Sequence, residues 1–328
     1  MINRIYQIDL VRVVCMIWIA GVWHFYGNYP PEYQFSPLGF KIAGIITEIV
    51  LATFTFLSGF FLSKYSFVKK NDVVFFYRKR FWRFYVLFII AVLCMFMLFS
   101  VESGGITKQG VIQMLSSLLG LSLFFPPPIS TLWYLSMLLM FYILTPLFRY
   151  SYSDKKVNLI WIITIFLILV VSFIVFKIDD RLLLYYPFYV IGLFFPKHLF
   201  EKISSARWIP VFVGGAICLG YIMLGRNEFY LKYTYLIFGV PMLISICYLI
   251  YFKRLNKIVS WASYATMCVY LFHRFLYPVV ILMFSKTING YKYMEMYYVI
   301  LSIVIFFVVG YGIQKAYDIV TNKLVYKN

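Results

Sequence analysis

Ten long apolar segments follow one another along this chain, and they constrain its fold more than any other feature. They cover approximately residues 10–28, 39–63, 84–101, 131–149, 157–176, 182–196, 208–225, 233–252, 262–284 and 295–315. A helix that crosses a membrane needs roughly 20 consecutive apolar residues, and most of these segments reach that length. The chain is 63% hydrophobic and only 13% charged. We therefore predict an all-α polytopic membrane protein with about ten transmembrane helices.

The 30 lysines and arginines are divided unevenly between the two sides of the predicted membrane domain. With the N-terminus in the cytoplasm, 21 of them fall on the cytoplasmic side, among them Arg149, and eight on the opposite side, among them Lys232. The remaining one, Arg274, lies within an apolar segment. Because cytoplasmic loops carry the excess of basic residues, we expect both termini to be cytoplasmic. The net charge of +18 then reflects topology and contact with the lipid bilayer, and we expect no nucleic-acid partner.

The chain contains no internal repeat, low-complexity tail or linker, so residues 1–328 are predicted to form a single transmembrane domain with no fused extracytoplasmic domain. The longest outer loop, 102–130, contains an amphipathic stretch at 111–124 followed by three prolines. We expect a short interfacial helix and then an extended segment. The five cysteines lie in apolar segments without a CxxC pair, which predicts no metal site.

The first apolar segment contains two polar residues, Arg12 and His24. By helix rise, His24 lies roughly 20 Å from the cytoplasmic start of its helix, in the outer half of the membrane. Such residues are costly in a bilayer and mark functional sites, and neutral imidazole can act as a general base near pH 7. The structural alternatives are a histidine hydrogen-bonded within the bundle and an arginine that extends to the cytoplasmic surface.

A basic loop, residues 64–83, precedes the third apolar segment and contains seven basic residues and one acid. Its last part carries Arg78, Arg80 and Arg83. Arg80 and Arg83 share a face if this part is helical, and forked guanidinium groups suit phosphate oxygens. This pattern favours a cytosolic site for a phosphorylated donor. The alternative is an anchor that contacts anionic lipid.

Three charged or titratable residues lie in later apolar segments. His273 and Arg274 belong to the ninth, and helix rise puts His273 roughly 17 Å into the membrane, close to the depth of His24. Glu48, in the second segment, needs a cationic partner or a proton. Arg12, His24 and Arg274 are its candidate partners.

Two short pairs complete the candidate site residues. Ser58 and Gly59 are small enough to permit close packing of two helices. Trp133 and Tyr134 lie at the outer end of the fourth segment, where aromatic residues form an interfacial belt. The same two rings could also stack on a sugar.

Taken together in chain order, several segments resemble the acyltransferase-3 family of bacterial integral-membrane acyltransferases. They are IDLVR…WHFY, FTFLSGFFLS, FFYRKRFWRFY, STLWYLSMLLMFYILTPLF and YATMCVYLFH. The resemblance implies transfer of an acyl group, usually acetyl from acetyl-CoA, to a hydroxyl of a cell-envelope carbohydrate. It also implies that the protein lies in the bacterial inner membrane. It implies that Arg12 and His24 are essential, and that Arg80 and Arg83 hold the CoA phosphates.

The chain departs from the family pattern in two places. The family commonly has ten residues between the first-helix Arg and His, whereas eleven separate Arg12 from His24. On an ideal α-helix this spacing turns the two side chains about 120° apart. We therefore predict a π-bulge between Cys15 and Gly21 that absorbs the extra residue. In addition, Leu138 stands where many members carry Glu.

We expect acyl-CoA as co-substrate, no tightly bound cofactor, and a carbohydrate as acceptor. The sequence is compatible with a homo-oligomer. His24 would take the proton of the acceptor hydroxyl, and an acyl-histidine route remains open. The main alternative is a polysaccharide or lipid-linked sugar exporter that uses the same polar cavity without making bonds. Nothing in the sequence argues for a purely regulatory subunit.

Overall fold

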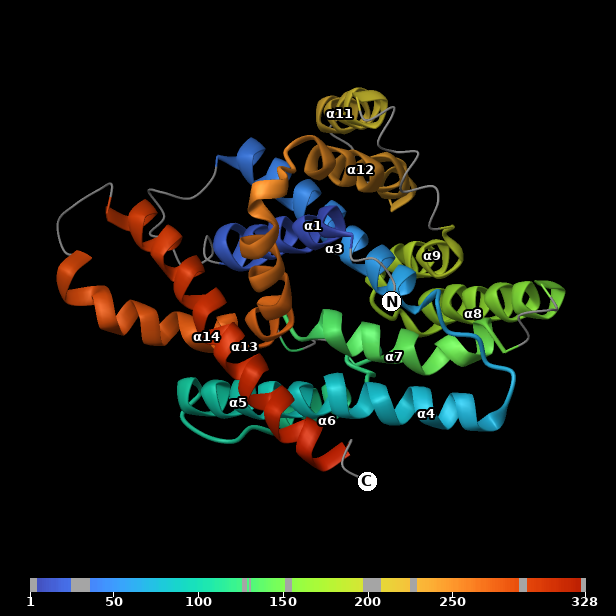
Figure 1. Cartoon of the computed structure of the whole chain (residues 1–328), viewed down its shortest axis with the longest axis horizontal. Coiled ribbons are helices and arrows are strands. Elements are labelled where there is room, and N and C mark those ends of the chain that lie inside the picture. The colour runs from blue at the N-terminus through green and yellow to red at the C-terminus, as the bar shows by residue number, and fades with distance from the viewer. Residues whose placement is uncertain are drawn as a thin grey trace. The chain divides into compact units, whose positions relative to one another are not determined.

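The computed structural model of the chain describes residues 5–24, 36–125, 129, 131–150, 155–196, 208–224, 229–288 and 294–325. These residues are mostly helical and include no strand (Figure 1), which confirms the all-α prediction. Each of the ten predicted apolar segments overlaps a helix. The helices and their bounds are α1 (Tyr6–Met16), η1 (Ile17–Trp23), α3 (Pro37–Leu62), α4 (Lys70–Arg80), η3 (Phe81–Tyr85), α5 (Val86–Glu102), α6 (Lys108–Leu118), α7 (Trp133–Phe148), α8 (Lys155–Phe176), α9 (Arg181–Phe194), α11 (Trp208–Leu224), α12 (Phe229–Leu249), η4 (Lys253–Leu255), α13 (Asn256–Ile288) and α14 (Met294–Val325).

Six helices within the described part of the chain are long and apolar enough to cross a membrane, judged by length and composition. They are Tyr6–Trp23, Pro37–Leu62, Lys70–Val101, Lys156–Phe176, Phe229–Leu249 and Ile300–Thr321. Helices α7, α9 and α11 are apolar but shorter. The chain is therefore a multi-pass membrane protein, while the count of ten crossings and the cytoplasmic placement of both termini stay predictions.

The helices group into two compact units. Unit 1 consists of Met1–Phe54 and Pro196–Val320, and unit 2 of Thr55–Phe195 and Thr321–Asn328. In unit 1, α1 packs on α12 and α13, and α11 packs on α12. In unit 2, α5 packs on α6, and α7 contacts α6, α8 and α9.

Local sequence signals explain where several helices begin. At the start of α3, the hydroxyl of Ser36 accepts a hydrogen bond from the amide of Gly39 at 3.2 Å, and Pro37 follows as the first helical residue. Serine at the cap and proline at the first position are the residues that helix starts prefer. At the start of α4, the carboxylate of Asp72 accepts from the amide of Lys69 at 2.9 Å. The single acid of the basic loop is thus a helix cap.

Two glycines follow the ends of helices α5 and α6. Gly104 after α5 and Gly120 after α6 have φ of 73° and 74°. Each forms the paired backbone bonds of a Schellman cap, for example from Leu121 N to Ser116 O at 2.8 Å. A short helix, α6, lies where the interfacial helix was predicted, although it begins at 108 and ends at 118; its position at the membrane interface stays a prediction. The predicted extended segment Pro126–Pro128 lies outside the described residues.

Helices α3 and α9 approach each other backbone to backbone. A Cβ atom at Gly59 would clash with the carbonyl oxygen of Tyr189, and one at Gly192 would clash with that of Phe56. Glycine is therefore required at both positions for this packing. The prediction that the Ser58-Gly59 pair permits close helix packing is confirmed for Gly59.

Candidate functional site

The two histidines that the sequence predicts to lie within the membrane meet in unit 1. His24, which follows η1, and His273, on α13, lie with His24 Nδ1 2.7 Å from His273 Nε2. Their ring planes differ by 16°, and their centroids are 4.9 Å apart. His273 has no exposed surface, whereas His24 is half-buried. The pair thus joins a ring enclosed by the helices to one that is partly accessible.

The ring of His273 is held by its own helix and by aromatic neighbours. Its Nδ1 lies 3.0 Å from the carbonyl oxygen of Val269 and 2.9 Å from that of Tyr270. The ring of Tyr277 stands edge-on to it, with centroids 5.8 Å apart. Arg274, the next residue, is half-buried. Both nitrogens of His273 therefore have defined partners in a mainly aromatic setting.

Arg12 reaches the same helix as His24, but not the histidine pair. Its guanidinium donates to Ser263 Oγ at 3.0 Å and to Thr266 Oγ1 at 2.9 Å, and it lies 3.7 Å from the Asp9 carboxylate. Thr266 and His273 are seven residues apart, close to two turns of α13. Arg12 and His24 therefore both face α13. These contacts indicate that Arg12 positions α1, while a catalytic role stays a prediction.

The predicted π-bulge is confirmed. Residues Ile17–Trp23 form the π-helix η1, which overlaps the expected interval and extends two residues beyond Gly21. A π-turn contains one residue more than an α-turn, since its hydrogen bonds run from i to i+5. The twelve-residue step from Arg12 to His24 therefore ends on the face that meets α13.

Glu48 has partners other than the three that we expected. Its carboxylate accepts hydrogen bonds from Lys232 Nζ, at 3.2 Å, and from the hydroxyl of Tyr235, both on α12. Neither residue is among the candidates Arg12, His24 and Arg274. Lys232, which we had counted with the outer loops, lies in α12 instead, where its charge balances that of Glu48.

The basic cluster lies in unit 2, where α4 continues into the second π-helix, η3. The guanidinium of Arg80 lies 5.4–5.9 Å from the ring centroids of Tyr65, Phe76 and Tyr142. Its Nε is buried without a hydrogen-bond partner among the described residues. Arg78 and Arg83 are exposed. Both π-helices thus fall in segments that the sequence marks as functional, and such turns cluster at functional sites.

The outer aromatic pair is packed against protein groups. The guanidinium carbon of Arg181 lies 4.0 Å from the centroid of the Trp133 ring, and Tyr185 stacks on the same ring at 6.2 Å. Tyr134 is buried, and its hydroxyl is 3.1 Å from that of Thr55. These contacts favour structural roles for both rings over contact with a sugar. Ser58 is half-buried beside Gly59.

Sequence reasoning missed Arg149, which we had placed in a cytoplasmic loop. It is buried, and it donates to the carbonyl oxygens of Tyr65, at 2.7 Å, and Leu193, at 3.2 Å. It therefore satisfies backbone groups just after α3 and at the end of α9. No pattern in the sequence separates it from the neighbouring basic residues. Thr266, a partner of Arg12, also went unpredicted. Its sequence position could have indicated it, because seven residues are close to two helical turns and put Thr266 on the same helix face as His273.

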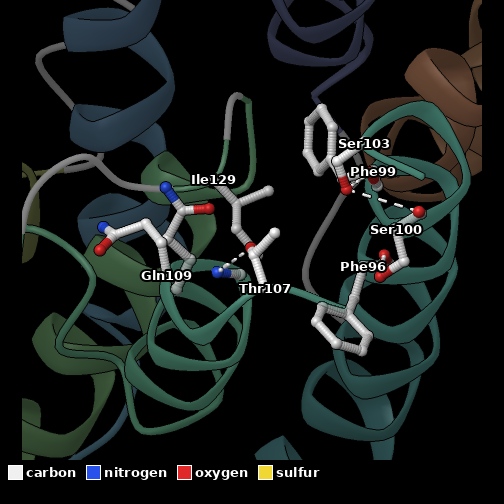
Figure 2. A pocket seen from close by; sticks show the side chains of 9 residues that line it. Phe96, Phe99, Ser100, Ser103, Thr107, Gln109 and Ile129 are labelled. Atoms are coloured by element: carbon white, nitrogen blue, oxygen red, sulfur yellow. Dashed lines mark hydrogen bonds between the residues drawn. The ribbon is translucent and has the colours of Figure 1, made fainter. Parts of the chain in front are cut away.

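A pocket of about 360 Å³ opens in unit 2 where α5 ends and α6 begins (Figure 2). Figure 2 shows Phe96, Phe99, Ser100 and Ser103 on one wall, and Thr107, Gln109 and Ile129 opposite them. The lining also includes Gly110 and Gln113. None of these residues is charged, so the pocket combines aromatic surface with hydroxyl and amide groups. Its volume lies within the range of small-molecule sites.

Within the described residues, no group of three or more His, Cys, Asp or Glu could hold a metal ion. The apolar helices and the hydrogen-bonded pair of His24 and His273 thus define a multi-pass membrane protein with polar groups between apolar helices. A family model described as an acyltransferase domain matches residues 5–315, nearly the whole chain and both units. The chain belongs to this acyltransferase-3 family of O-acyltransferases, and it is a membrane enzyme that acts on hydroxyl groups. No curated protein and no solved structure matches it.

Proposed function

We propose that this enzyme transfers an acetyl group from cytosolic acetyl-CoA to a hydroxyl of a cell-envelope carbohydrate, in the cytoplasmic membrane of a bacterium. The hydrogen bond between His24 and His273 carries the proposal. A half-buried imidazole with an ordered partner suits general-base catalysis at neutral pH, and acyl transfer to a hydroxyl requires such a base.

In the proposed reaction, His24 takes the proton of the acceptor hydroxyl while the hydroxyl oxygen attacks the thioester carbonyl carbon. The carbon–oxygen bond forms and the carbon–sulfur bond breaks. His24 then returns the proton to the departing thiolate, so the products are the O-acyl ester and free CoA. General-base catalysis of this kind contributes about 10²–10⁴-fold to a rate.

The donor phosphates are assigned to the arginines of α4 and η3. Arg80 offers a guanidinium whose Nε is buried without a hydrogen-bond partner among the described residues, and Arg83 lies three residues further on. A planar guanidinium binds phosphate oxygens through two parallel hydrogen bonds. The rings around Arg80 hold this group in place before the anion arrives.

The acceptor is assigned to the pocket between α5 and α6. Sugars present both polar hydroxyls and apolar C–H faces, which match its amide groups and its phenylalanine rings. None of the described residues that line it is charged, which favours a neutral ring. It lies next to the loop 102–130, which the distribution of basic residues predicts to be on the outer side.

The test is acyl transfer by the purified protein in liposomes, with acetyl-labelled acetyl-CoA inside and envelope glycans outside. We expect labelled ester on the glycan and one free thiol per ester. His24→Ala should lower the rate about 10²–10⁴-fold, whereas His198→Ala, the change of the third histidine, serves as the matched control. Glycan transport without ester formation would support the exporter instead.

A further inference from the structure

His273 can be assigned a protonation state from its backbone contacts. Its Nδ1 faces two carbonyl oxygens, those of Val269 at 3.0 Å and Tyr270 at 2.9 Å. A carbonyl oxygen only accepts hydrogen bonds, so Nδ1 must carry the proton. In a neutral ring the other nitrogen, Nε2, then carries the lone pair.

The lone pair of His273 determines the tautomer of His24. His273 Nε2 lies 2.7 Å from His24 Nδ1, a distance that requires one donor and one acceptor. Since His273 Nε2 accepts, His24 Nδ1 must donate. The proton of neutral His24 is thereby held on Nδ1, and its lone pair lies on Nε2.

A charged His273 would reverse this direction, but its surroundings oppose a charge. The ring is fully buried, its neighbours Tyr270 and Tyr277 present aromatic surface, and the next residue is the cation Arg274. Burial and a like charge both disfavour an imidazolium. The neutral form with the proton on Nδ1 is the one that fits.

We infer that His273 is the positioning residue of the acyl-transfer site, and that it holds His24 in the tautomer whose Nε2 accepts a proton. The inference rests on the proposed function for the identity of the reaction, but the tautomer itself does not. His273 does not exchange the proton with substrate. It also stabilises the imidazolium that forms when Nε2 of His24 is protonated, because its lone pair accepts from Nδ1 throughout the cycle.

This arrangement resembles in logic the carboxylate that orients the histidine of a serine hydrolase. Here the orienting group is a neutral imidazole, and two backbone carbonyls orient it in turn. A neutral partner suits a membrane interior, since a buried carboxylate beside an unprotonated histidine would lack a counter-charge.

The tautomer can be observed without any activity. The chain contains three histidines, so a ¹⁵N-histidine-labelled protein in detergent gives few ring signals, and single substitutions assign them. We expect both His24 and His273 to carry the proton on Nδ1. A His24 signal from the Nε2–H tautomer, or a charged His273, would overturn the inference whatever the enzyme's substrates prove to be.

Two variants test the consequence for catalysis. In His273→Gln, the side-chain carbonyl can take the place of Nε2 and accept from His24; in His273→Asn, the shorter side chain reaches only the region of Nδ1. We expect His273→Asn to lower kcat about 10²-fold with the KM of acetyl-CoA unchanged, and His273→Gln to recover most of that loss. The ¹⁵N spectrum should show the Nδ1–H tautomer of His24 kept in the Gln variant and lost in the Asn variant.

Equal activity of the Gln and Asn variants, with unfolding temperatures like the wild type, would contradict the positioning role. Failure of the wild-type protein to transfer an acyl group would contradict the proposed function instead. In that case the ¹⁵N measurement still decides the state of the histidine pair.

Discussion

Arg12 donates a hydrogen bond of 3.0 Å to Ser263 Oγ, and Ser263 in turn donates one of 2.7 Å to the carboxylate of Asp9. This contact joins α1 to α13 well before the point along both helices where His24 meets His273. The two helices are thus held together by polar groups at two levels. The contact of Arg12 and Asp9 with Ser263 aligns α1 with α13, and the hydrogen bond between His24 and His273 requires this alignment.

Ser263→Ala should disturb this alignment. The change removes one partner each from Arg12 and Asp9, and an unsatisfied buried polar group costs about 1–3 kcal/mol. We expect a lower unfolding temperature in detergent and a reduced kcat. Ser66→Ala, at an exposed serine, is the control. An unchanged unfolding temperature and kcat in Ser263→Ala would show that the hydrogen bonds of Ser263 with Arg12 and Asp9 do not align the two helices.

Deleting Val22 tests the π-helix. Because η1 holds one residue more than an α-helix would, the shortened segment can become α-helical while Arg12 and His24 still face α13. We expect the variant to fold and to keep acyl transfer within about tenfold of the wild type. Deleting Met267 from α13, which is a regular α-helix between Thr266 and His273, should instead turn His273 about 100° relative to Thr266 and abolish activity. A larger loss of activity from the deletion of Val22 than from the other deletion would contradict the role that we give to η1.

Arg80→Lys should weaken binding of the donor. Lysine keeps the charge but cannot present two parallel donors to a phosphate, so we expect the KM of acetyl-CoA to rise about tenfold or more, which is ~1.4 kcal/mol. The kcat should change less. Lys70→Gln, an exposed residue at the start of α4, is the control for a general loss of basic charge. A similar KM in both variants would exclude a specific role for Arg80.

Gln109→Ala should affect the acceptor and not the donor. The loss of one hydrogen bond costs about 0.5–1.5 kcal/mol, so the KM of the carbohydrate acceptor should rise by up to about tenfold, while the KM of acetyl-CoA stays constant. Lys108→Ala is the neighbouring control, since Lys108 does not line the pocket. An acceptor KM unaffected by Gln109→Ala and Phe99→Ala would remove the pocket from the proposal.

Gly59→Ala should separate α3 from α9. The added methyl group meets the Tyr189 carbonyl, and overpacking of this kind costs about 1–3 kcal/mol. Gly44→Ala in the same helix is the matched control, because a Cβ atom at Gly44 has no neighbour within 4 Å. We expect the unfolding temperature to fall in the first variant and to stay the same or rise in the second. Equal behaviour would mean that the close approach does not stabilise unit 2.

The helices, the caps and the π-bulge could be predicted because they depend on residues close together in the chain. The apolar segments indicated helices, and Ser36-Pro37 marks a helix start within the local sequence. The bulge followed from a count of residues between Arg12 and His24. Each of these features involves hydrogen bonds or contacts within a few residues, so hydropathy and spacing are sufficient to indicate them.

The partners of the polar residues could not be predicted in this way. Glu48 pairs with Lys232 and Tyr235, which are not among the residues that we expected. Arg149 is buried although its sequence context suggests an exposed loop. Depth in the membrane brought His24 and His273 to a similar level, but depth does not say which helices are neighbours. Which helices pack against each other depends on many weak side-chain contacts summed over whole helix faces.

The sequence alone therefore determined that this chain is a helical membrane protein, which family it belongs to, and which residues are chemically unusual. Only the tertiary structure decided that His24 and His273, which are 249 positions apart in the sequence, form a hydrogen bond, and that backbone carbonyls of α13 set the direction of that bond. The physical reason is that a hydrogen bond between distant residues requires both helices to be packed in one register, and no local pattern encodes that register.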